Sequence, residues 1–150
     1  MAQSAYAEIA SAEGTSHGRI DLIETSRGVL LRAQLYGLPA GPRGFHIHEV
    51  GRCEPPFQSA GGHFNPSGAR HGFLSSAGGH AGDLPNLSVP EGGAVTVELL
   101  LPGVTLKEGE PESLLDAEGT AFIIHAGADD YRSDPAGNAG RRIACGVIRQ

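Results

Sequence analysis

The segment GVLLRAQLY, residues 28–36, decides the fold class because its apolar and polar side chains alternate. Val29, Leu31, Ala33 and Leu35 fall on one side of an extended chain, and Arg32 and Gln34 fall on the other. Successive side chains of a β-strand point to opposite faces of its sheet. The spacing therefore predicts a half-buried strand of an antiparallel sheet.

The same kind of segment recurs along the chain. GAVTVELLL, residues 93–101, alternates in the same way. Shorter apolar runs, bounded by Gly, Asp or Pro, are HGRIDLIET (17–25), GTAFIIHA (119–126) and RIACGVI (142–148). No segment has the apolar spacing and cap of an amphipathic helix. We therefore expect an all-β fold, built as a sandwich or a barrel.

Length and composition restrict the class of protein further. A chain of 150 residues without a visible repeat or linker is expected to form a single domain over residues 1–150. The net charge of −6 argues against nucleic acid and anionic membranes as partners. The longest uncharged apolar run, LLLPGV at 99–104, is too short for a membrane span.

The N-terminus and the cysteines bear on the compartment. The sequence MAQSAYAEIA has no basic head and no apolar core, so no secretory signal is visible. The protein is then cytosolic, or a signal has been removed and a Met added. Cys53 and Cys145 form no CxxC motif, and both two buried thiols and one disulfide are open.

Histidines concentrate in one glycine-rich segment, residues 44–83, which holds five of the seven. His46 and His48 are two positions apart in an expected strand, so both imidazoles project from one face. Such a pair suits copper, zinc or iron, although a lone His-x-His pair also arises by chance. About forty residues with little periodicity then follow. Loops of this length are uncommon, and metal binding can order one.

This long segment offers a second set of possible ligands: His63, His71, His80 and Asp83. Three imidazoles and one carboxylate match the tetrahedral preference of zinc. The surrounding glycines allow the tight turns that would bring these side chains together. The alternative is a group of solvated loop histidines, but six of the seven histidines with ligand spacing favours metal binding.

Two residues near the C-terminal strands are ambiguous from the sequence alone. His125 ends the apolar run AFII, where a structural histidine is commoner than a ligand. It joins the first two histidines only if its strand lies beside FHIH. Asp129 is either a turn residue or a carboxylate that orients a metal-bound imidazole.

Five motifs in order resemble the copper/zinc superoxide dismutase family. They are GFHIHEVGRCEPP, SAGGHFNPSGARHGF, GGHAGDLPNL, FIIHAGADD and GNAGRRIACGVI. The resemblance spans residues 44–148 and implies an eight-stranded antiparallel Greek-key barrel, an immunoglobulin-like sandwich architecture, with long metal-binding and electrostatic loops.

The resemblance also implies a role for particular residues. His63 would bridge the two metals and take part in catalysis, Arg142 would dock the anion, Asp129 would link His46 to His71, and Cys53 would pair with Cys145. The copper ligands would be His46, His48, His63 and His125. The zinc ligands would be His63, His71, His80 and Asp83.

The implied activity is disproportionation of superoxide to dioxygen and hydrogen peroxide, with cycling copper and a structural zinc. Two alternatives are a copper/zinc storage or delivery protein without turnover, and a β-sandwich module stabilised by zinc alone. Besides superoxide, candidate partners are a second copy, as a homodimer, and a copper-delivery protein. A disulfide would favour a periplasmic or extracellular location over the cytoplasm.

Overall fold

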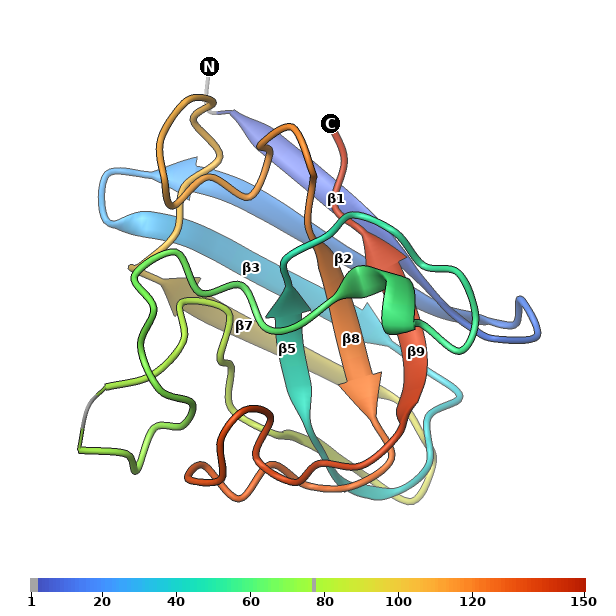
Figure 1. The fold of residues 1–150 in the computed structure, drawn as a ribbon. Coiled ribbons are helices and arrows are strands. Elements are labelled where there is room, and N and C mark those ends of the chain that lie inside the picture. The colour runs from blue at the N-terminus through green and yellow to red at the C-terminus, as the bar shows by residue number, and fades with distance from the viewer. Residues whose placement is uncertain (1–2, 77) are drawn as a thin grey trace.

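The computed structural model describes residues 3–76 and 78–150, and it is built almost entirely from β-strands (Figure 1). The strands are β1 (Ser4–Ser11), β2 (Ser16–Thr25), β3 (Gly28–Leu35), β4 (Gly41–Arg43), β5 (Phe45–His48), β6 (Leu87–Val89), β7 (Val95–Leu101), β8 (Ala121–His125) and β9 (Arg142–Val147). A short 3₁₀ helix, η1 (Gln58–Ala60), lies in the loop after β5. Within the described ranges, no helix is long and apolar enough to cross a membrane.

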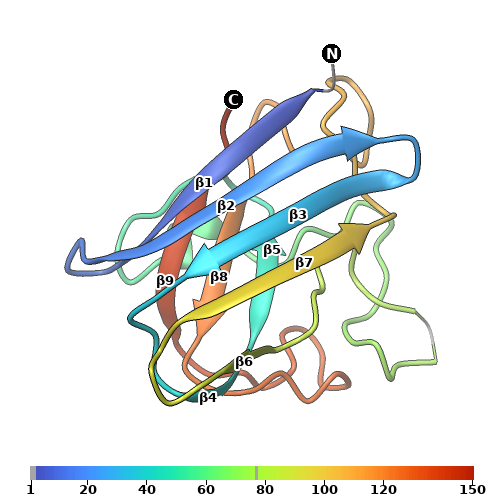
Figure 2. The same ribbon diagram turned by 180° about the vertical axis from the view of Figure 1, so that it is seen from behind.

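Seven strands form one antiparallel sheet in the order β5-β8-β9-β1-β2-β3-β7. The sheet curls into two layers, with β5, β8 and β9 facing the viewer in Figure 1 and β1, β2, β3 and β7 facing the viewer in Figure 2. The remaining pair, β4 and β6, forms a separate ladder. Because β4 leads into β5 and β6 leads into β7, this ladder connects the two edge strands of the large sheet. The predicted antiparallel all-β architecture is confirmed.

The number of strands differs from the eight that the family resemblance implies. The described part of the chain has nine, because β4 and β6 contain only three residues each and form their own two-stranded ladder. Three residues are too few for an alternating pattern to be recognised in the sequence. Both short strands lie at the ends of loops and close one side of the curled sheet.

The alternation along β3 accounts for the core. Val29, Leu31, Ala33 and Leu35 are buried between the layers, while Arg32 between them faces solvent. The strands β5 and β8 are buried along their whole length, which simple alternation does not predict. One face of this pair packs into the core, and the other lies beneath the long loops. The functional side chains lie on that second face.

Candidate metal centre

The loop after β5 docks back onto β5 through backbone hydrogen bonds. The Ile47 amide donates to the Gly82 carbonyl at 2.9 Å, and the Ile47 carbonyl accepts from the Phe64 amide at 2.8 Å. A Cβ at position 82 would lie 2.3 Å from the Ile47 carbonyl oxygen, so the close approach requires glycine. This pairing brings His63 and Asp83 beside the histidines of β5.

A first group of four imidazoles forms on the outer face of β5 and β8. His125 joins this group because β8 pairs with β5, with His46 opposite Ile123. The strand that ends at His125 thus lies beside FHIH, as was required for His125 to join the histidines of that strand. One nitrogen from each ring lies within 4.8 Å of the others. The members are His46, His48, His63 and His125.

Hydrogen bonds fix the tautomers of three of these rings. Nδ1 of His48 donates to the Gly61 carbonyl at 2.8 Å, and Nδ1 of His125 donates to the Gly140 carbonyl at 3.0 Å. Nε2 of His46 lies 2.7 Å from a carboxylate oxygen of Asp129. A neutral imidazole carries one ring proton, so the opposite nitrogen of each ring presents a lone pair.

These lone pairs converge on one point. Nδ1 of His46 and Nε2 of His48, His63 and His125 are buried and have no hydrogen-bond partner among the described residues. A buried polar atom without a partner costs about 1–3 kcal/mol, so four together would strongly destabilise the fold. A cation bound by all four nitrogens removes that cost. This donor set fits copper, for which imidazole is a suitable ligand.

A second group lies on the other side of His63. Nδ1 of His63 and Nδ1 of His71 lie 2.9 and 2.8 Å from Oδ1 of Asp83, and Nδ1 of His80 lies 3.1 Å from Nδ1 of His63. The other oxygen, Oδ2, accepts from the amides of Gly72 at 3.0 Å and His80 at 2.9 Å. The carboxylate is therefore oriented so that Oδ1 faces the three rings.

The second group also calls for a cation. Nε2 of His71 lies 2.8 Å from Oδ1 of Asp129, and its proton there leaves Nδ1 as a lone pair. That lone pair faces Oδ1 of Asp83, an arrangement that is repulsive unless a cation lies between them. Three nitrogens and one oxygen at these separations fit zinc. Since His63 has one nitrogen in each group, its ring connects the two.

Asp129 connects the groups by a second path. Its two oxygens bind Nε2 of His46 and Nε2 of His71, and its side chain is fully buried. Metal-bound histidines commonly donate their second ring proton to a carboxylate, which fixes the ring. Asp129 therefore links His46 to His71, as the resemblance implies, and its Oδ1 also accepts from the Tyr131 amide at 2.7 Å, a contact typical of a turn residue.

The electrostatics favour the protonation states that metal binding needs. Burial lowers the pKa of His46 to about 4 and of His125 to about 3, and it also lowers the pKa of His48. Burial alone would raise the pKa of Asp129, but hydrogen bonds from His46 and His71 hold it at about 2. At neutral pH the rings of His46, His48 and His125 are therefore neutral and Asp129 is ionised, which are the states that metal binding needs.

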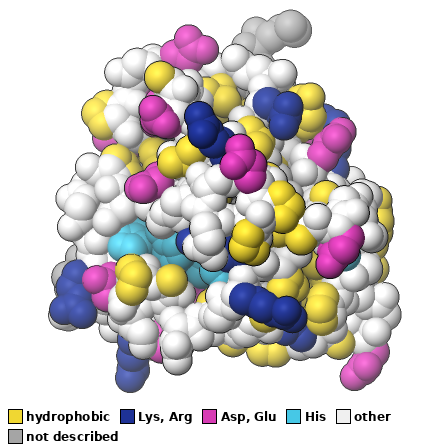
Figure 3. All heavy atoms as spheres, turned by 45° about the vertical axis from the view of Figure 1, so that its right-hand side comes forward, with side chains coloured by type: hydrophobic (Ala, Val, Ile, Leu, Met, Phe, Trp, Pro, Cys, Tyr) yellow, Lys and Arg dark blue, Asp and Glu magenta, His cyan; other side chains and the backbone are white. Residues whose placement is uncertain are grey.

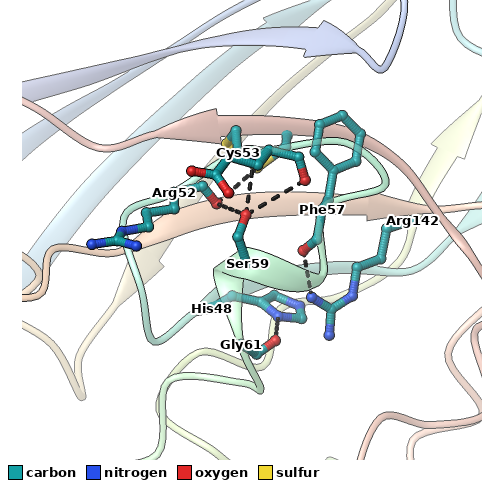
Figure 4. Close-up of a disulfide and its surroundings, with 9 residues drawn as sticks. His48, Arg52, Cys53, Phe57, Ser59, Gly61 and Arg142 are labelled. Carbon is teal, nitrogen blue, oxygen red and sulfur yellow. Dashed lines mark hydrogen bonds between the residues drawn. A yellow bond between two sulfur atoms is a disulfide. The ribbon is translucent and has the colours of Figure 1, made fainter.

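Arg142 begins β9 close to the first group (Figure 4). Its Nη1 donates to the Phe57 carbonyl at 2.7 Å, and the half-buried guanidinium contributes to lowering the pKa values of His48 and His125. Figure 3 shows histidine side chains in a hollow of the surface, with basic side chains beside them. An anion that enters this hollow would meet positive charge.

The two cysteines form a disulfide, with sulfur atoms 2.01 Å apart (Figure 4). Cys53 lies in the loop after β5 and Cys145 lies in β9, so the bond ties this loop to the sheet. The implied pairing is confirmed, and the alternative of two separate thiols is wrong.

Sequence reasoning missed residues that hold Asp129 in place. The side chain of Asn86 makes two hydrogen bonds to the backbone of Asp129. Its Nδ2 donates to the Asp129 carbonyl at 2.9 Å, and its Oδ1 accepts from the Asp129 backbone N–H at 2.8 Å. Gly137 packs so closely that a Cβ there would lie 1.9 Å from Oδ1 of Asp129. Both lie within the quoted motifs, GGHAGDLPNL and GNAGRRIACGVI, but spacing alone does not show what they contact.

Fold and donor groups together define a β-barrel protein with two adjacent, histidine-rich groups, each of which could hold a metal ion. A family model described as copper/zinc superoxide dismutase (SODC) matches residues 16–148. A Cu-Zn superoxide dismutase 2 from Aquifex aeolicus is 56% identical over 147 residues, covering 97% of this chain and 86% of that protein. The superoxide dismutase-like protein YojM from Bacillus subtilis is 44% identical over 146 residues, covering 95% and 74%.

Solved structures of similar proteins have the same fold. A double mutant of a SOD-like protein from Bacillus subtilis matches with a TM-score of 0.93 and 44% identity, over 97% of each chain. The chain belongs to the copper/zinc superoxide dismutase family. The predicted enzyme class, an oxidoreductase, and the predicted cofactors, copper and zinc, are those of this family.

Proposed function

We propose that this protein is a superoxide dismutase, which converts superoxide into dioxygen and hydrogen peroxide. The observation that carries the proposal is the convergence of four buried, unpaired ring nitrogens beside an arginine. His46, His48, His63 and His125 would hold copper, and the second group, His63, His71, His80 and Asp83, would hold zinc. Bound copper would supply one-electron oxidation and reduction, while zinc has no accessible redox change.

The protein residues would then position the anion and deliver a proton. Arg142 presents a planar fork of donors, one of which is fixed by the Phe57 carbonyl, and the remaining donors can bind superoxide. His63 is buried, with Nδ1 held toward Asp83, so Nε2 is the atom that can carry a proton to the departing peroxide. Asp129 would keep His46 and His71 oriented on either side.

The alternative is a copper/zinc storage or delivery protein. A relative named only as dismutase-like, YojM, keeps this alternative relevant. The arginine beside the first donor group favours the enzyme, because storage of metal requires no anion-binding residue. The zinc-stabilised module is disfavoured by the full set of four nitrogens in the first group.

Metal analysis followed by a superoxide-consumption assay separates these functions. Protein expressed with added copper and zinc should contain one of each per chain and consume superoxide. One copper and one zinc without turnover would support storage or delivery, and zinc alone would support the structural module.

The organisation of the protein is a separate prediction. We propose that residues 1–150 act as a single domain, since one core cluster takes side chains from both layers of the sheet. A homodimer and a copper-delivery partner stay predictions. Sedimentation of the metal-loaded protein over a range of concentrations tests the homodimer.

A further inference from the structure

The side chain of Asp134 contacts, from outside, the second group of possible ligands, called here the zinc group (His63, His71, His80 and Asp83). Its Oδ1 accepts a hydrogen bond from the backbone N–H of His71 at 2.9 Å. The same oxygen lies 3.9 Å from Nε2 of His80, the ring nitrogen opposite the one that faces Asp83. One carboxylate thus faces two residues of the zinc group.

The zinc-group residues differ in how they are anchored. His71 is held through its ring by Asp129, and Asp83 is held by two backbone amides. The ring of His80 is the more accessible one, with 7% of its side chain exposed against 0–1% for the other three members. The carboxylate that faces its outer nitrogen is Asp134. A histidine bound to a metal through one nitrogen commonly donates the other proton to such a carboxylate.

The local chain holds Asp134 in this position. The carboxylate of Asp130 accepts from the amides of Arg132 and Ser133, both at 2.8 Å, and the Gly137 amide donates to the Ser133 carbonyl at 2.6 Å. These bonds close a compact turn around residue 134. A side chain on a turn closed in this way is aimed by the backbone, although 43% of its surface is exposed.

The turn is also attached to the loop that carries His71. The Leu74 amide donates to the Tyr131 carbonyl at 2.9 Å. Gly72 has a positive φ of 107°, and a Cβ there would lie 1.9 Å from the same carbonyl oxygen. The backbones on either side of Asp134 and His71 are therefore in direct contact, so movement of one displaces the other.

We infer that Asp134 is a positioning residue for zinc, which fixes the backbone of His71 and orients the ring of His80. The inference rests on the proposed zinc site and extends it to a carboxylate outside the four ligands. The contacts of Asp134 to His71 and to His80 require different chemical groups at position 134. The His71 amide needs only an oxygen acceptor, whereas the outer N–H of a metal-bound His80 favours a negative charge.

Two substitutions test separately the need for an acceptor oxygen and the need for a negative charge. Asp134→Asn keeps an acceptor oxygen for His71 and removes the charge, while Asp134→Ala removes both. Asp116→Asn is the matched control, because Asp116 is an exposed carboxylate in another loop, where it accepts from the Gly119 amide. The zinc dissociation constant is measured by competition with a chelator, on full-length protein with the disulfide intact. The absorption spectrum of Co²⁺ in the zinc site reports ligand geometry.

Outer carboxylates of metal-bound histidines typically change metal affinity by about 10–100-fold. We expect Asp134→Ala to weaken zinc binding by about that factor and to shift the Co²⁺ spectrum. Asp134→Asn should lie between Ala and the parent, and Asp116→Asn should match the parent. Copper affinity, measured with zinc saturating, should stay within about twofold of the parent.

Zinc affinity in Asp134→Ala within twofold of the parent would overturn the inference. Equal losses of zinc and copper affinity would overturn it as well, because they would indicate general loosening of the loop. A parent protein that takes up no zinc would instead count against the proposed function. The measurement on the parent therefore distinguishes the two failures.

Discussion

Nη1 of Arg142 donates a hydrogen bond to the carbonyl oxygen of Phe57 at 2.7 Å. Phe57 has a positive φ of 78°, and its own amide donates to the Glu54 carbonyl at 2.7 Å, so its carbonyl is held by a tight turn. The guanidinium is thus fixed at one corner and half-buried near the histidines of the first group. An arginine held in this way is suited to bind an anion in one orientation.

Replacing Arg142 with Ala should lower kcat/KM for superoxide by about 10–100-fold, the factor expected for one charge-assisted hydrogen bond. It should also flatten the dependence of kcat/KM on ionic strength, because the nearby positive charge is lost. Copper and zinc content should not change. Pulse-radiolysis rates at several salt concentrations, with metal analysis of the same samples, check this prediction.

Arg142→Lys is the matched control, since lysine keeps the charge but lacks the planar fork. Its salt dependence should resemble that of the parent, and its kcat/KM should lie between those of the parent and the Ala variant. Identical salt slopes for the parent and the Ala variant would refute the docking role.

Gly137→Ala should disrupt the link between the donor groups. The residue has a φ of 69°, and a Cβ would lie 1.9 Å from Oδ1 of Asp129 and 2.6 Å from Nε2 of His71. We expect Asp129 to be displaced and the affinity for both metals to fall by about 10–100-fold. Chelator competition measures the affinities.

Gly68→Ala provides the control for backbone strain. Gly68 has the same φ of 69°, but nothing lies within 4 Å of a Cβ built there. It should lower the free energy of unfolding by only about 1 kcal/mol, through the strain of a left-handed conformation. Metal affinities that fall equally in both variants would show that strain, rather than the collision with Asp129, is responsible.

The metal-free protein should lose stability in acid. Burial lowers the pKa of His46 to about 4 and of His125 to about 3, from 6.5 in the unfolded chain. Between these values the unfolded state binds more protons, so the free energy of unfolding falls as pH drops below about 6.5. Asp129, with its pKa lowered from 3.8 to about 2, acts in the same direction at lower pH.

Urea unfolding of metal-free protein between about pH 8 and pH 3 tests this expectation. His125→Asn, which keeps a donor for the Gly140 carbonyl but does not titrate in this range, should show a shallower fall. A free energy of unfolding that does not change down to pH 4 would contradict the prediction.

The disulfide should contribute substantially to stability. Cys53 and Cys145 are separated by 92 positions, and the chain-entropy relation gives about 4–5 kcal/mol for a loop of that length. Replacing both cysteines with Ser should lower the free energy of unfolding of the metal-free protein by up to this amount. Urea unfolding with and without reductant provides the measurement, and the double variant should not respond to reductant. A difference below about 1 kcal/mol would show that the unfolded chain is little constrained.

Much of the fold could be predicted because side-chain alternation reports burial directly. The segments at 28–36 and 93–101 correspond to β3 and β7 within two residues. The strand β1 was not marked by the same signal, because two of its buried positions, Ala5 and Ala7, are small and form no run of large apolar side chains. Its pairing with β2 and β9 becomes evident only in three dimensions.

The donor groups could be predicted in part for a different reason. His63, His71, His80 and Asp83 lie close together in sequence, so their spacing carries information. His125 depended on the pairing of β8 with β5, a contact between distant segments that spacing cannot show. Contacts by which Asn86, Gly137 and Asp134 support these groups depend on the packing of two loops against each other, which leaves no periodic pattern.

The cross-link has a consequence beyond stability. It fastens the segment that carries Phe57 to the strand that carries Arg142, while the imidazoles have their own anchors in Gly61, Gly140 and Asp129. Reduction of the disulfide would free the segment that carries Phe57 and Gly61 from the strand that carries Arg142, while His46 and His125 would keep their hydrogen bonds to Asp129 and Gly140. The position of the guanidinium would then depend on the redox poise of the surroundings as well as on the packing of the loop.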